Sequence, residues 1–89
     1  MFQDIGRRVE EVQRAVQSVR VPVSDPGGLV RLTAGPGGSV EELAIADQAY
    51  RLSAEELAEL ITDTMKDGAA KADAEVRRIA VDTMREGDR

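Results

Sequence analysis

The chain has 89 residues, of which 33% are charged, and its formal net charge at pH 7 is −5. It contains no cysteine, no histidine, no tryptophan, one tyrosine and one phenylalanine. This composition excludes disulfides, thiolate nucleophiles, imidazole bases and most zinc or iron sites. It also leaves no set of aromatic side chains on which nucleic-acid bases could stack. We therefore expect no cofactor and no metal.

The length predicts a single domain over residues 1–89. A core of this size supplies only a few kcal/mol, so a partner chain is the expected further source of stability. No apolar run reaches the roughly 20 residues of a membrane span, and the first turns carry charges instead of a signal-peptide core. We expect a soluble cytoplasmic protein without a membrane partner.

The negative charge is unevenly distributed along the chain. Residues 1–20 contain four arginines and three acidic residues, whereas residues 52–89 contain six basic and ten acidic residues. An acidic protein does not attract nucleic acid through its net field. Any binding to DNA must therefore come from local groups of basic side chains.

The first segment is predicted to be a helix, because its apolar residues recur at alternating intervals of three and four. This is the a/d repeat of a helix that buries a narrow stripe. The repeat lasts under three heptads, so the helix is expected to pack on another element. The apolar residues are Phe2, Ile5, Val9, Val12, Val16 and Val19.

Around residue 19 the apolar period changes from that of a helix to that of a strand. Every second residue from Val19 to Val23 is a valine, which predicts a short strand. Pro22 lies inside it and cannot donate to a ladder, so the strand belongs at a sheet edge. Residues 24–28, SDPGG, then turn the chain.

Residues 27–46, GGLVRLTAGPGGSVEELAIA, have the pattern of a strand, a four-residue turn and a second strand, which predicts a β-hairpin. Val30, Leu32 and Ala34 are predicted to share one face of the first strand. The residues predicted to share a face of the second strand are Glu41, Leu43 and Ile45.

The glycines of residues 35–38, GPGG, have two interpretations, a phosphate-binding loop and a turn. A P-loop requires a lysine after its last glycine, and a dinucleotide-binding loop lies between a strand and a helix. No lysine is near Gly38, and the glycines separate two strand patterns. The sequence therefore favours a turn.

The last segment is predicted to be one long helix. Ser53 and Glu56 form a capping box at its start, and no proline interrupts the apolar periodicity that follows, so the helix extends about 30 residues, or ~45 Å. Residues 67–74, DGAAKADA, have small side chains. They are either good helix formers around a tolerated glycine or a crossing point with a helix of a second subunit. The order α-β-β-β-α predicts an α+β fold, with a three-stranded antiparallel sheet and a long C-terminal helix.

Catalysis is not expected. The carboxylate pairs Glu41–Glu42 and Glu55–Glu56 are adjacent in sequence and so diverge on a strand or helix. General acid–base catalysis needs convergence in a pocket, and nucleophilic triads need a histidine or cysteine in almost every form. We interpret the protein as not an enzyme.

The basic residues of the two helices have two interpretations. One is a solvated face held by ion pairs at helical spacing, such as Asp67–Lys71, Asp63–Lys66, Asp73–Arg77 and Asp82–Arg78. The other is a pair of basic stripes that hold DNA phosphates when a dimer doubles them. The residues proposed for these contacts are Arg7, Arg8, Arg14, Arg77, Arg78 and Arg85.

The chain resembles the YbaB/EbfC family of nucleoid-associated proteins over residues 1–85. The resemblance rests on residues 27–46, whose strand–turn–strand pattern is described above, on the order of the elements, and on residues 53–76, SAEELAELITDTMKDGAAKADAEV. The positions that match the family's structural pattern are Gly28, Leu29, Val30, Arg31, Thr33, Leu43 and Ile45.

The resemblance implies a homodimer built around the β-sheets, with helices that project like tweezers, which binds DNA in the bacterial nucleoid. The expected function is non-catalytic DNA binding, mainly through phosphate contacts and with low sequence specificity. The alternative is a protein–protein interaction module of the same fold that has lost DNA binding and docks another protein through its acidic long helix.

Overall fold

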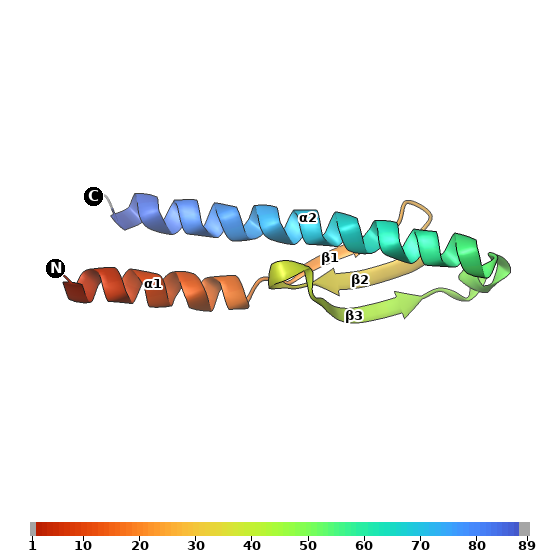
Figure 1. Cartoon of the computed structure of the whole chain (residues 1–89), viewed down its shortest axis with the longest axis horizontal. Helices are drawn as coiled ribbons and strands as arrows, with labels where there is room; N and C mark the ends of the chain where they lie inside the picture. Colours follow the sequence, from red (N-terminus) through yellow and green to blue (C-terminus); the bar gives the residue numbers. More distant parts are fainter. Residues whose placement is uncertain (1, 88–89) are drawn as a thin grey trace.

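The computed structural model describes the backbone of residues 2–87 and the side-chain surroundings of residues 5–85, so the predicted burial of Phe2 lies outside it. The predicted order of elements is confirmed (Figure 1). The elements are α1 (Phe2–Gln17), β1 (Val21–Ser24), β2 (Val30–Ala34), β3 (Val40–Ile45) and α2 (Ala54–Gly87), with 3₁₀ turns at Pro36–Gly38 and Asp47–Arg51.

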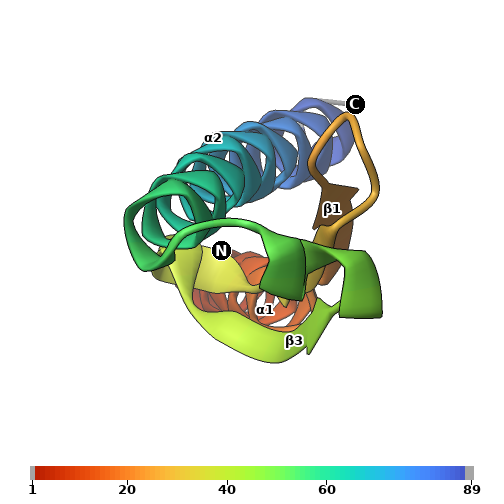
Figure 2. The same ribbon diagram turned by 90° about the vertical axis from the view of Figure 1, so that its right-hand side faces the viewer.

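The three strands form one antiparallel sheet in the order β1-β2-β3, at one end of a rod that measures 60 × 17 × 16 Å. Helix α2 runs the length of this rod. Its first half lies over one face of the sheet, and its second half lies beside α1 (Figures 1 and 2). The α+β fold class is therefore confirmed.

Buried and exposed side chains alternate along β1 and β2, as the sequence predicts. Val30, Leu32 and Ala34 are buried on the face that α2 covers, whereas Arg31 and Thr33 point outward. β1 is an edge strand, as its proline requires. The prediction that this strand begins at residue 19 is wrong by two residues, because Val19 lies in the link after α1 and is buried in the core.

Strand β3 departs from simple alternation at a β-bulge. Thr33 pairs with Glu42 but Ala34 pairs with Val40, so the residue between them is left without a partner. The predicted face of Leu43 and Ile45 is confirmed, since they pair with inward-facing residues of β2. The extension of that alternation to Glu41 is wrong, because the bulge places Val40 opposite Ala34 instead.

The GPGG stretch is a turn, as predicted. Gly37 and Gly38 have φ angles of 73° and 80°, which favour glycine, and the Gly35 N–H donates to the Ser39 carbonyl at 2.7 Å. The turn also touches α2, because a Cβ added at Gly38 would lie 3.1 Å from the Cβ of Ala69. The glycines therefore let a hairpin pass close to a helix.

The small residues of α2 serve a contact within the chain. A Cβ added at Gly68 would lie 3.0 to 3.1 Å from side-chain atoms of Val23, Leu32 and Ala34, and Ala72 is fully buried among the same residues. Helix α2 therefore approaches the sheet more closely than a larger side chain would permit. This contact accounts for Gly68 and Ala72, whereas Ala70 and Ala74 are exposed. The crossing with a helix of a second subunit stays a prediction.

The predicted capping box starts α2. The Glu56 N–H donates to the Ser53 hydroxyl at 3.1 Å, and the Ser53 N–H donates to the Glu56 carboxylate at 3.0 Å. The hydrogen bond from the Ser53 backbone holds the pKa of Glu56 below its ordinary value of 4.5. The helix that follows has 34 residues, slightly more than predicted, and a length of about 51 Å.

The hydrophobic core is small and formed mainly by valine and alanine. Val19, Val23, Leu32, Ala34 and Ala72 form its buried cluster. Larger apolar side chains remain outside, among them Leu43, Met65 and Met84. None of the helices in the described part of the chain is long and apolar enough to cross a membrane.

We predict that Gly68→Val destabilises the protein by about 1–3 kcal/mol, because the new side chain overpacks the contact between α2 and the sheet. Urea denaturation at a fixed protein concentration measures this loss. The matched control is Gly6→Val in α1, where an added Cβ meets nothing within 4 Å; its stability should change by no more than about 0.5 kcal/mol. Equal losses in the two variants would contradict the close-packing account.

The capping box predicts a pH dependence that Glu56→Gln removes. Because folding lowers the pKa of Glu56, its charged form stabilises the fold fully above pH 4.5, and this contribution is lost as the pH falls through the folded-state value. The stability difference between wild type and Glu56→Gln should shrink over that range in denaturation curves taken at successive pH values. A stability difference that grows as the pH falls would contradict a lowered pKa of Glu56 in the folded state.

Candidate nucleic-acid interface

All six arginines proposed for DNA contact lie on the arm, which we define as α1 together with residues 73–87 of α2. The two helices of the arm pack side by side, away from the sheet (Figure 1). Helix α1 is stable only when its apolar stripe packs against another element, because a short isolated helix is marginal in water. Helix α2 extends beyond the sheet far enough to provide that surface.

Arg7 and Arg14 lie on the outer side of α1. At 100° per residue they project away from Val12 and Val16, which are half-buried and line hollows shared with α2. Arg14 is 3.9 Å from Glu10, but both side chains are largely exposed, at 80% and 68%. An exposed pair at this distance is worth little, so both arginines are accessible to a phosphate.

Arg8 lies elsewhere on α1. It is half-buried and lines the groove between the two helices of the arm. The adjacent arginines in the sequence thus have different surroundings, which the spacing alone does not reveal.

The basic residues of α2 are mostly held by ion pairs within the helix. Arg77 is 3.1 Å from Asp73, and Lys71 is 2.9 Å from Asp67. Arg78 pairs with both Glu75 and Asp82. Three of the four ion pairs predicted from spacing are therefore present, whereas Asp63–Lys66 does not appear among the ion pairs of residues 5–85.

The pair between Arg78 and Glu75 is the one that shifts pKa values on the arm. A hydrogen bond from Arg78 holds the pKa of Glu75 below its ordinary value of 4.5. The same contact raises the pKa of Arg78, with a smaller contribution from Asp82. Arg78 is thus bound on two sides, while Arg85 forms no ion pair with any side chain that the structure describes.

The structure does not bring the six arginines to one surface. Arg7 and Arg14 project away from α2, and at helical spacing Arg78 and Arg85 project away from the residues of α2 that contact α1. The two basic stripes therefore lie on opposite sides of the arm. A straight duplex could reach only one of these stripes of an arm at a time.

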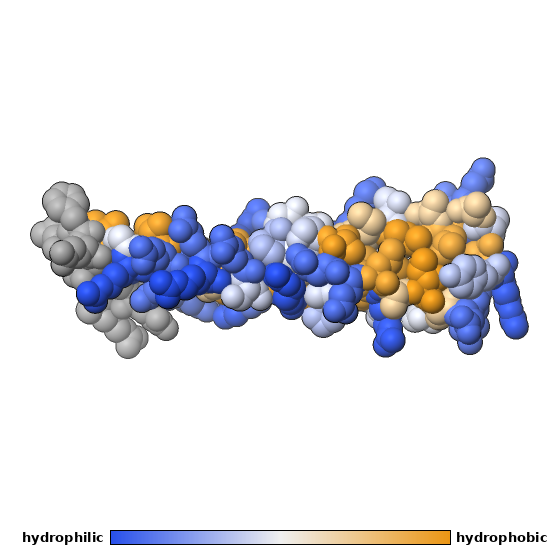
Figure 3. Space-filling view, turned by 90° about the horizontal axis from the view of Figure 1, so that it is seen from below, coloured by the Kyte–Doolittle hydropathy of each residue, from blue (hydrophilic) through white to orange (hydrophobic). Residues whose placement is uncertain are grey.

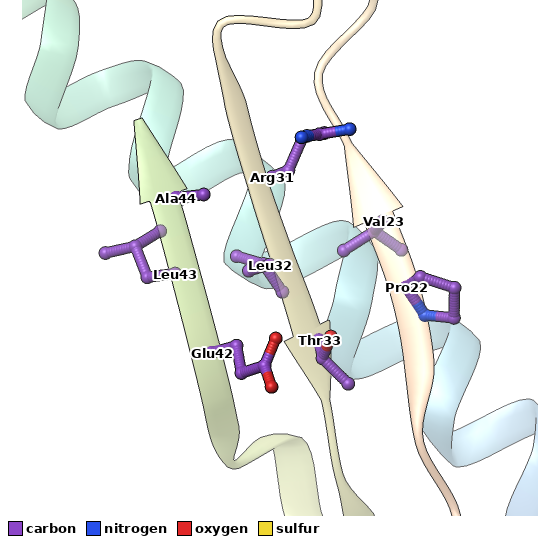
Figure 4. A pocket seen from close by; sticks show the side chains of 8 residues that line it. All are labelled: Pro22, Val23, Arg31, Leu32, Thr33, Glu42, Leu43 and Ala44. Carbon is purple, nitrogen blue, oxygen red and sulfur yellow. The ribbon is translucent and has the colours of Figure 1, made fainter. Parts of the chain in front are cut away.

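The outer face of the sheet forms an open hollow of about 520 Å³ (Figure 4). Arg31 and Thr33 of β2, Glu42 of β3 and Pro22 of β1 line it. It contains one arginine and one carboxylate, so paired carboxylates for acid–base catalysis do not converge there. The sequence pattern indicates Arg31 and Thr33 only as structural positions and does not reveal this hollow.

The inner face of β3 is left partly uncovered. Helix α2 contacts β1 and β2, while Leu43 of β3 remains 49% exposed although it points to the same side as the buried Leu32. In the view of Figure 3, apolar residues gather at the end that holds the sheet, and the arm is mostly hydrophilic. The apolar side chain of Leu43 is thus left partly in contact with water on the face of the sheet that holds the core.

The comparisons with known proteins agree with the resemblance in the sequence. The profile of the YbaB/EbfC DNA-binding family matches residues 1–86, which is nearly the whole chain. No curated protein matches the sequence.

We predict that the pKa of the Glu75 carboxyl, followed by NMR titration, lies below 4.5 in the wild-type protein and rises toward that value in Arg78→Gln. The adjacent Arg77→Gln is the matched control and should leave this pKa unchanged, because Arg77 pairs with Asp73. If the two variants shift the pKa of Glu75 equally, the assignment of the ion pair to Arg78 is wrong.

Proposed function

Because the chain belongs to the YbaB/EbfC DNA-binding family, we propose that it binds DNA without catalysis, as a homodimer in the bacterial cytoplasm, where it associates with the nucleoid. The contacts are mainly to phosphates, so sequence specificity is low. The observation that carries the proposal is the family match over residues 1–86, supported by exposed arginines on the arm.

Arg7 and Arg14 are the first phosphate contacts in this proposal. They are one heptad apart on an exposed face, about 10 Å along the helix, and are not engaged by strong ion pairs within the described side chains. Arg85, at the end of α2, is also exposed and forms no ion pair with any side chain that the structure describes. Arg77 and Arg78 must exchange carboxylate partners for phosphate, and Arg8 contributes from the groove. The net charge of −5 opposes binding at long range. Affinity falls as salt rises with a slope set by the number of phosphate contacts.

The dimer is supported by the thin core and by the uncovered side of β3. A second copy that buries Leu43 and neighbouring apolar side chains would supply the stability that the small core lacks. The two arms would then project from a common body, which doubles the number of phosphate contacts.

A second candidate function is favoured by the acidic side of α2. Glu55, Glu59 and Asp63 follow one another at intervals of four and are exposed, and none is in an ion pair among the side chains that the structure describes. In this alternative the long helix docks a basic surface of another protein, and DNA binding has been lost.

We predict that Arg7→Gln with Arg14→Gln weakens binding to any duplex sequence and lowers the slope of log K against log salt by about 1 per lost contact. Arg51→Gln is the matched control, because Arg51 is an exposed arginine in the turn before α2, at the sheet end of the molecule. Fluorescence titration of a 20-base-pair duplex at several salt concentrations makes both measurements. The phosphate assignment fails if the control loses as much affinity as the double variant, and DNA binding itself fails if no duplex binds at low salt.

We also predict that Leu43→Asp converts the dimer into a monomer, because it places a charge in the surface that the second copy covers. Light scattering during size-exclusion chromatography at micromolar concentrations measures the mass. Thr62→Asp, an exposed polar position on α2, is the control and should remain dimeric. A wild-type protein that is already monomeric would contradict the proposed dimer.

A further inference from the structure

The outer face of the sheet, opposite to the face that α2 covers, carries no helix in the described part of the chain. Helix α1 extends away from the sheet on the arm (Figures 1 and 2). The alternation and the register place six side chains on this face: Pro22, Ser24, Arg31, Thr33, Glu42 and Ala44. The hollow of about 520 Å³ opens here.

The outer face carries two charges of opposite sign that do not pair with each other. Arg31 lies opposite Ser24 and Ala44, whereas Glu42 lies one cross-strand row further along, opposite Thr33. The side chain of Arg31 leans toward β1, away from Glu42 (Figure 4). Neither residue forms an ion pair with any side chain that the structure describes. Both charges are therefore available to a second molecule.

A second copy of the same face fits this pattern of charges in one orientation. Two stacked sheets lie about 10 Å apart, and identical faces meet about a two-fold axis. An axis along the strands would place Arg31 over Arg31 of the second copy, which brings like charges together. An axis across the strands exchanges the two rows of side chains. It places Arg31 over Thr33 of the second copy and beside Glu42 of that copy, so two equivalent ion pairs form.

The shape of the outer face leaves room for this arrangement. Pro22, Thr33 and Ala44 have short side chains, and they line the hollow together with Glu42. A long arginine side chain from the second copy can therefore enter the hollow and reach the carboxylate. The face consists of three strands of four to six residues. It is smaller than a stable interface, which buries roughly 1,000 Å² or more, so the contact is weaker than the dimer proposed at β3.

We propose that the outer faces of two copies stack back to back, held by reciprocal ion pairs between Arg31 of each copy and Glu42 of the other. The strands run along the rod (Figure 1), so this orientation turns the two rods in opposite directions. The arms then lie at opposite ends of the assembly. The stacking itself does not rest on the proposed function. Under that function, the assembly holds DNA at both ends.

Charge reversal provides the test. Arg31→Glu and Glu42→Arg each leave two like charges on the outer face, so each variant alone should lose the contact. A mixture of the two variants restores opposite charges across the interface and should associate. Sedimentation velocity at roughly 100 µM protein, where weak contacts form, measures this. Wild type and the mixture should both sediment faster than either variant alone.

The matched control is the pair Arg51→Glu and Asp47→Arg. Both residues are exposed in the turn before α2, and the two substitutions change the charge by the same amounts as the test pair. Because the chain has a net charge of −5, all four variants remain negative, so general attraction is equal in the two mixtures. Each control variant should sediment like wild type, and mixing them should change nothing.

The double variant Arg31→Glu with Glu42→Arg keeps both charges in exchanged positions and should sediment like wild type. It decides the question if a single variant fails to fold, which circular dichroism reveals. Slower sedimentation of a folded double variant would overturn the stacking.

Equal sedimentation of wild type and both folded single variants would also overturn the stacking, as would equal association in the control mixture. The outer face would then be a solvated face, which antiparallel sheets can carry. No DNA is present in these measurements. Their failure is therefore distinct from a failure of DNA binding, which the salt titration of Arg7→Gln with Arg14→Gln tests.

Discussion

The structure depends on one close contact, the approach of α2 to the inner face of the sheet at Gly68 and Ala72. No larger side chain fits between this helix and the valine, leucine and alanine of β1 and β2. Because the contact lies near the middle of a 34-residue helix, it divides α2 into a half that covers the sheet and a half that extends beyond it. The extended half gives α1 a surface on which to pack. The arm, with its arginines and its groove, is therefore a consequence of where the two smallest residues of the interface lie.

The same arrangement limits how the arm can meet DNA. Its arginines occupy opposite sides of two packed helices, and those on α2 are held by carboxylates of their own helix. Membership of the YbaB/EbfC DNA-binding family establishes the class of the protein. Under the proposed function, Arg7 and Arg14 on α1 dominate phosphate binding, and the ion pairs of Arg77 and Arg78 reduce what α2 adds. A chain with a net charge of −5 would then bind DNA weakly, through few contacts, and the number of those contacts would set the slope of log K against log salt.

Most of the fold could be predicted from the sequence, because local signals specify it. The capping box at Ser53 and Glu56, the GPGG turn and the alternation in β2 each depend on residues close together in the chain. The bulge in β3 could not be predicted, since it depends on the register between two strands. The role of Gly68 could not be assigned for a similar reason. A glycine in a helix indicates that another element packs closely there, but the sequence does not say which element it is. The groove between α1 and α2 depends on how the two helices pack against each other, which the narrow apolar stripe of α1 does not specify.

The central claim is that DNA phosphates contact the arginines of the arm. Two-dimensional NMR of the arginine Nε–Hε groups, recorded while a 20-base-pair duplex is added at low salt, tests it at individual residues. We expect the largest changes at Arg7, Arg14 and Arg85, smaller changes at Arg77 and Arg78, and little change at Arg31 and Arg51, which lie at the sheet end. Changes confined to Arg31 and Arg51, or none at any arginine while the duplex is bound, would contradict the claim.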